Sequence, residues 1–293
     1  MKKILIPTDF TLNSFQTIDY VLKLFKHETC EFYFLNTYSY DANGLDAIQL
    51  LQADEDWFDK PKQNAQKQLG KLVERYTLNC KALNHQFFAV SDCSELLLSI
   101  QKNIKDLNID LIILTSKKEK NLGKKTQSIV EKIRCCPVLI VPPHAATSNK
   151  INITIASDFK QQVNTHQIDK FLNILENTNL EITVLILEKQ NAISDTASNN
   201  LEAMLDYLKQ ISGHTASLHY TGASYNLKAY AQSHLDGIMC VIDKKPRLLR
   251  KIGVFKSDIF STLKQLHTNT VLTIHITIII IALLSWMVPP PIV

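Results

Sequence analysis

The sequence predicts an α/β protein of two tandem doubly wound domains, each a five-stranded parallel sheet flanked by helices. First, the phrase Lys3-Ile-Leu-Ile-Pro-Thr-Asp-Phe10 returns 149 positions later as Asn152-Ile-Thr-Ile-Ala-Ser-Asp-Phe159. Second, the apolar run Asp110-Leu-Ile-Ile-Leu-Thr115 corresponds to Asp236-Gly-Ile-Met-Cys-Val-Ile242 in the second half. Third, each half alternates short apolar runs with segments of helical spacing. Such alternation is typical of right-handed βαβ units.

The domain limits follow from the repeat. We expect one domain over residues 1–143 and a second over 151–275, followed by a hydrophobic C-terminal tail over 276–293. The chain of 293 residues is long enough for two domains of about 140 residues, each with its own core. The join around Pro142-Pro143 is short and polar, so no separate linker is needed.

In the first domain, apolar runs rich in β-branched and aromatic residues predict five strands, and apolar faces at helical spacing predict four helices. The expected strands lie near 3–7, 31–38, 83–90, 110–115 and 138–141, and the helices near 13–26, 63–77, 94–106 and 126–134. Asp92 and Glu95 have the spacing of a capping box at the start of the third helix. A polar stretch around 41–62 makes this copy the longer one.

The second domain repeats the alternation. Its strands are expected near 151–156, 181–187, 215–220, 236–242 and 271–275, and its helices near 165–177, 199–211, 224–233 and 257–267. The final helix and strand match the first copy without a gap, because Gly123-Lys124 and Lys256-Ser257 each lie fourteen residues before the last apolar run. The last strands of both domains are apolar edges that an isolated domain leaves unpaired, so we expect them to meet.

Charge and composition exclude several classes of function. The net charge of +4 is spread thinly over both halves and gives no reason to expect nucleic acid. Six cysteines lack metal spacing, which indicates reduced thiols and a cytoplasmic protein. The histidines show no paired acid or nucleophile, so we expect a protein that is not an enzyme and has neither catalytic residues nor a metal site.

Three motifs together resemble the universal stress proteins. They are Ile4-Leu-Ile-Pro-Thr-Asp-Phe-Thr11, the run 110–114, and Leu122-Gly-Lys-Lys-Thr-Gln-Ser-Ile-Val-Glu-Lys132 leading into Cys136-Pro-Val-Leu-Ile-Val-Pro142. The likeness covers residues 1–143 almost completely and is weaker but collinear over 151–275. It implies strand order 3-2-1-4-5 in each domain. It also implies an intramolecular pseudo-dimer in which the domains pair through their last strands.

Many members of that family bind ATP, and the resemblance places the site after the first and fourth strands. The candidate cofactor-binding residues here are Asp9, Thr115, Gly123 and Lys124. The family pattern has a glycine-rich loop whose N–H groups approach the phosphates. In this chain Thr115 and Lys118 replace the first two glycines, and Lys124 replaces the closing hydroxyl residue. These departures predict a degenerate site with weak ATP binding or no cofactor.

Two alternatives stay open at this site. The lysines around the phosphate position could hold an anion by charge, although a lysine run on a loop is usually a solvated face; they are Lys117, Lys118, Lys120, Lys124 and Lys125. Asp9 could contact the adenosine of a ligand or simply cap the next helix. The copy of Asp9 is Asp158, in a half whose loop Ile242-Asp-Lys-Lys-Pro246 has no glycine.

A long apolar run, Val271 to Val288, covers the last expected strand and continues into the tail. Because the last strand takes residues 271–275, about a dozen residues remain, and a membrane-spanning helix needs about 20. We therefore expect packing or association and not insertion, with a tail-anchored membrane adaptor as the alternative. Together, these features predict a stress-response regulatory or interaction protein with an unknown protein partner and possible homo-oligomers. An ATP-binding or slowly ATP-hydrolysing switch is the other alternative.

Overall fold

The computed structural model describes residues 1–40, 55–81, 83–116, 123–148, 150–163, 165–212, 215–221, 226–243 and 258–275. The first half contains β1 (Lys2–Pro7), α1 (Leu12–Leu24), β2 (Cys30–Thr37), α3 (Glu55–Asn79), β3 (His85–Asp92), α4 (Leu96–Leu107), β4 (Leu111–Thr115), α5 (Lys124–Lys132) and β5 (Val138–Val141). The second half contains β6 (Ile151–Ser157), α6 (His166–Ile174), β7 (Leu180–Ile186), the 3-10 turn η1 (Gln190–Ala192), α7 (Asp195–Ser212), β8 (Ser217–Tyr220), α8 (Leu227–Ser233), β9 (Ile238–Asp243), α10 (Asp258–Gln265) and β10 (Thr270–His275).

All ten strands belong to one sheet, in the order β3-β2-β1-β4-β5-β10-β9-β6-β7-β8. Each half therefore has the expected order 3-2-1-4-5, with parallel neighbours. The two last strands pair antiparallel at the centre, where Leu139 lies opposite Leu272. Apolar strand edges are covered in this way, as the sequence led us to expect.

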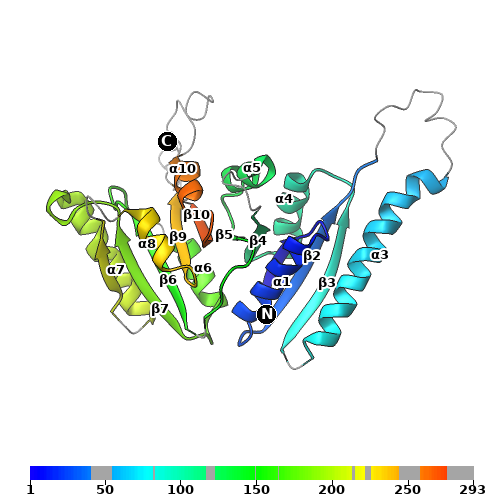
Figure 1. Cartoon of the computed structure of the whole chain (residues 1–293), viewed down its shortest axis with the longest axis horizontal. Helices are drawn as coiled ribbons and strands as arrows, with labels where there is room; N and C mark the ends of the chain where they lie inside the picture. Colours follow the sequence, from blue (N-terminus) through cyan, green and yellow to red (C-terminus); the bar gives the residue numbers. More distant parts are fainter. Residues whose placement is uncertain are drawn as a thin grey trace, which may run out of the picture.

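Helices cover both faces of the sheet, and Figure 1 shows α3 and α7 towards its two outer ends, with β5 and β10 between the halves. One face packs on α1, α3, α6 and α7, and its core runs through both halves. The other face packs on α4, α5, α8 and α10. Two apolar layers on opposite faces explain why the inner strands are apolar along their whole length, as in β4 and β5.

The structure corrects two local expectations. The helix expected near 63–77 is α3, which already begins at Glu55 and contains Pro61. The capping box is also wrong, because β3 still includes Asp92 and the N-cap of α4 is Glu95, without a side-chain cap. The Asp92 carboxylate instead accepts hydrogen bonds from Ser99 Oγ (2.5 Å) and Asn103 Nδ2 (3.0 Å). Several predicted features lie outside the described residues: the lysines at 117–120, the loop at 244–246 and the tail at 276–293.

Candidate functional site

The carboxyl ends of β1 and β4 form the candidate site. In a doubly wound sheet, ligands bind where neighbouring strands have connections that leave in opposite directions, which is here between β1 and β4. Asp9 follows β1 and Thr115 ends β4, so both lie at this edge. Gly123 is the N-cap of α5 and Lys124 is its first residue. The fold therefore brings the predicted residues to one edge of the sheet.

Asp9 is held in a tight turn by its neighbours. Its Oδ1 accepts hydrogen bonds from the backbone N (3.2 Å) and Oγ1 (2.6 Å) of Thr11, which is the N-cap of α1. Burial alone raises the pKa of Asp9, but the hydrogen bonds from Thr11 outweigh burial and hold the pKa below its usual value. The Oδ1 atom of this exposed carboxylate is thus used at the start of α1.

The second half repeats this turn. Phe10 N donates to Thr8 Oγ1 (3.2 Å), and Phe159 N donates to Ser157 Oγ (3.1 Å). Asp158 Oδ1 accepts from the backbone N two residues on, as Asp9 does. Both phenylalanines have positive φ, 59° and 51°, which is uncommon for a residue with a bulky side chain. The repeated geometry means that the hydroxyl-Asp-Phe sequence encodes a turn in both halves.

Thr115 stands where the resemblance requires a glycine. Its Oγ1 is buried and has no hydrogen-bond partner among the described residues. The next residue, Ser116, is tied to the sheet because its N donates to the carbonyl of Val141 (2.8 Å). A side chain at position 115 occupies space that backbone N–H groups would need to approach a phosphate.

Two features of the start of α5 bear on anion binding: the residue Gly123 and the lysines that follow it. A Cβ added to Gly123 meets no atom within 4 Å, and its φ of −57° is open to any residue, so nothing in its surroundings requires glycine. Lys124 and Lys125 follow at the positive end of the helix dipole, and the first turn has no acidic residue. This pattern favours a weak contact with an anion.

In the second half an ion pair spans the corresponding edge. Lys160, which follows the turn at Asp158, pairs with Glu188, which lies just beyond β7. Its counterpart in the first half is Thr11, which has no such charge. The sequence analysis did not identify this pair, although the change from Thr11 to Lys160 is visible when the two repeats are aligned.

Sequence reasoning also missed Asn36, whose Nδ2 donates to the carbonyl of Thr8 (2.8 Å) and ties the end of β2 to the end of β1. Within the described ranges, no three His, Cys, Asp or Glu residues gather in a group that could hold a metal ion. No helix in these ranges combines the length and the apolar character that a membrane crossing requires.

Comparison with known proteins supports the fold. No protein-family model matches the sequence, and no curated protein matches it. A solved universal stress protein from Archaeoglobus fulgidus superposes with a TM-score of 0.64 at 14% identity, over 93% of this chain and 98% of that chain. A functionally unknown protein from Pseudomonas aeruginosa superposes with a TM-score of 0.54 at 12% identity, over 94% and 92% of the two chains. The chain therefore has the fold of the universal stress proteins, which confirms the fold that the sequence resemblance implied.

Proposed function

We propose that the protein is a regulatory or interaction module of the universal stress protein type, acting in a stress response in the cytoplasm. It is not an enzyme, and its two halves act as an intramolecular pseudo-dimer. The nucleotide site of its first half is degenerate, and ATP binds there weakly or not at all.

One observation carries this proposal: in both halves the carboxylate of the turn, Asp9 or Asp158, accepts a hydrogen bond from the backbone N–H two residues on. In the first half Thr11 Oγ1 donates a second hydrogen bond to Asp9 Oδ1. In the second half the same turn occurs beside the ion pair Lys160–Glu188, at an edge with no other binding feature among the residues that the structure describes. The turn is present in the half that has the candidate nucleotide site and also in the half that lacks other binding features among the described residues. We therefore attribute the turn to folding and not to ligand binding.

A second candidate function is an ATP-binding switch in the first half. One feature favours it: the lysine pair at the start of α5. Its charges would interact favourably with a phosphate oxygen. Attraction by exposed lysines is screened by salt, however, so this contact alone supports only weak binding.

Titration calorimetry of the full chain with Mg²⁺-ATP distinguishes the two. At about 0.15 M salt we expect no site tighter than roughly 10 μM, which corresponds to about 7 kcal/mol of binding free energy. We also expect no phosphate release above the background of buffer alone. A submicromolar dissociation constant or catalytic turnover would overturn the proposal.

A matched pair of variants identifies the source of any weak binding. Lys124→Ala removes one charge at the start of α5, whereas Lys132→Ala removes one at its other end. If the switch function holds, only Lys124→Ala weakens ATP binding and reduces its salt dependence. Equal effects in both would indicate attraction by net charge alone.

A further inference from the structure

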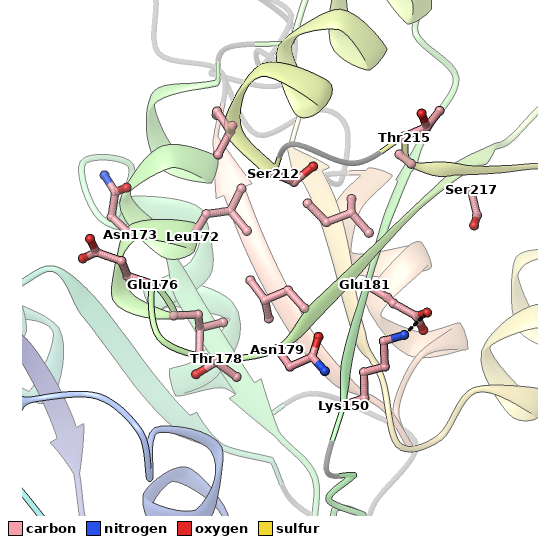
Figure 2. Close-up of a pocket in the computed structure, with 15 residues that line it drawn as sticks. Lys150, Leu172, Asn173, Glu176, Thr178, Asn179, Glu181, Ser212, Thr215 and Ser217 are labelled. Atoms are coloured by element: carbon pink, nitrogen blue, oxygen red, sulfur yellow. Dashed lines mark hydrogen bonds and ion pairs between the residues drawn. The ribbon is translucent and has the colours of Figure 1, made fainter.

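A hollow of about 780 Å³ lies at the opposite, amino-terminal edge of the sheet, in the second half. Its walls come from the end of α6, the turn into β7, the end of α7 and the start of β8. Its apolar lining consists of Leu172, Leu175, Leu180, Ile182, Ile211 and Ala216. Figure 2 shows polar side chains around its margin, with Asn173 and Glu176 on one side and Thr215 and Ser217 on the other.

The first half fills the corresponding place with aromatic rings. Phe32 lies opposite Ile4 on β1 and opposite Phe87 on β3. The rings of Phe32 and Phe87 stack at 5.6 Å, and His85 meets Phe32 edge-on at 5.0 Å. Tyr76 of α3 packs against the same group, with its ring 6.1 Å from that of Phe87.

The strand registers identify the counterparts in the second half. Ile153 is the repeat of Ile4 and lies opposite Ile182, so Ile182 replaces Phe32. Ala216 directly precedes Ser217, which lies opposite Thr183, so Ala216 replaces Phe87. All four side chains pack on the same face of the sheet. Two aromatic rings have therefore become an isoleucine and an alanine, and the space that they leave forms part of the hollow.

The margin of the hollow favours neutral or cationic groups. Glu176 and Glu181 both lie on it, and each is ion-paired, Glu176 with Lys2 of β1 and Glu181 with Lys150. The carboxyl ends of α6 and α7 also face this region and carry the negative ends of their helix dipoles. An anionic group placed here therefore meets balanced side-chain charges and the negative ends of two helices.

We propose that this hollow is a binding site for a small molecule with a neutral or cationic aromatic ring system. The ring takes the place that Phe32 and Phe87 occupy in the first half, and polar substituents reach the marginal amides and hydroxyls. The volume lies within the range of about 300–1,000 Å³ that is usual for small-molecule sites. This function is independent of the nucleotide site, which lies at the other edge of the sheet.

Two related fluorescent probes test the site on the full chain. N-phenyl-1-naphthylamine is neutral, and 8-anilino-1-naphthalenesulfonate has the same ring system with one added negative charge. We expect saturable 1:1 binding of the neutral probe and weaker binding of the sulfonate. Absence of saturable binding, or preference for the sulfonate, would overturn the proposal.

Ala216→Phe restores one aromatic ring of the first half and occupies the part of the hollow in which we place the ring of the ligand. We expect it to weaken binding of the neutral probe by about tenfold or more, because the probe would then have to enter occupied space. Ala89→Phe is the matched control, since it adds the same side chain to an exposed position on the edge strand of the other half. Circular dichroism of both variants establishes that they are folded. If Ala216→Phe binds the probe as wild type does, the proposal fails.

A surface variant gives an independent result if Ala216→Phe does not fold. Glu176 is 72% exposed at its side chain, so Glu176→Lys is expected to leave the core intact. It should raise the affinity for the sulfonate relative to the neutral probe by about threefold or more. An unchanged ratio would contradict the proposal. So would sedimentation data in which probe binding falls as the protein self-associates, because a second copy would then cover the hollow.

Discussion

Glu28 and Asn177 lie 149 residues apart, at equivalent positions of the two repeats, and hydrogen-bond to each other. Glu28 is only 3% exposed, and its carboxylate accepts from Asn177 N (2.9 Å), Asn177 Nδ2 (3.0 Å) and Thr178 Oγ1 (2.7 Å). A buried carboxylate is costly unless it is hydrogen-bonded, and here these three hydrogen bonds all come from the other half. The contact joins the halves through polar groups, whereas β5 and β10 join them through backbone pairing.

We predict that Glu28→Ala lowers the free energy of unfolding by about 1–2 kcal/mol, because three hydrogen bonds between the halves are lost. Urea unfolding at neutral pH measures the change, and Glu74→Ala, at an exposed position of α3, is the control. Asn177→Glu should also destabilise the protein, because two carboxylates would then face each other. Stability equal to that of wild type in both variants would show that this contact does not hold the halves together.

A second prediction concerns a contact that both halves retain. Tyr76 Oη donates to Asp19 Oδ1 (2.8 Å), and Tyr207 Oη donates to Asp169 Oδ1. Burial, followed by the hydrogen bond to Asp19, raises the pKa of Tyr76, so its hydroxyl remains a donor at neutral pH. Tyr76→Phe should cost about 1 kcal/mol of stability. A double-mutant cycle with Asp19→Ala measures the coupling, and additive effects would contradict the assigned bond.

The same substitution in both repeats distinguishes a structural role of Asp9 from a role in ligand binding. If the turn is structural, Asp9→Ala and Asp158→Ala should each lower stability, by about 1 kcal/mol as for the loss of a helix-start hydrogen bond. Neither should change ATP binding in calorimetry. A large loss of ATP affinity in Asp9→Ala alone would instead assign Asp9 to a ligand.

Asp92 makes the stability depend on pH. Burial raises its pKa, but hydrogen bonds from Ser99, Lys102 and Asn103 outweigh burial and hold the pKa below 3.8. A carboxyl whose folded pKa is depressed stabilises the protein above its unfolded pKa, and this contribution is lost as the pH falls through the folded pKa.

Asp92→Asn should therefore be less stable than wild type by about 1–3 kcal/mol at pH 7, and the difference should narrow below about pH 4. Unfolding in urea across this pH range tests the prediction. Asp106→Asn, at an exposed position of α4, is the control. A difference that stays constant with pH would exclude ionisation of Asp92 as its cause.

The apolar tail over residues 276–293 gives a prediction from sequence alone. Removing it should leave both halves folded and reduce the oligomer size, because an apolar segment that could associate is then absent. Sedimentation velocity of the full and shortened chains measures this. If the full chain instead resists carbonate extraction from membranes and the shortened chain does not, the tail is an anchor.

Much of the fold could be predicted because it is encoded locally. Ile4 and Ile6 alternate with other residues in β1 as Ile153 and Ile155 do in β6, which indicates two similar strands. The strands of the structure lie within a few residues of the positions expected from the sequence. Apolar periodicity determines such elements, since it specifies which face each segment must bury. Local pattern failed at Asp92, because its side chain bonds to Ser99 and Asn103 and not to backbone N–H groups.

The sequence by itself determined that the chain is a tandem α/β repeat, that its halves meet at their last strands, and that Thr115 and Lys124 depart from the family's pattern. Only the tertiary structure revealed the contact of Glu28 with Asn177, the ion pair Lys160–Glu188 and the hollow beside Ala216. The reason is physical: periodicity is a property of neighbouring residues, whereas these features depend on which distant side chains the packed sheet places together.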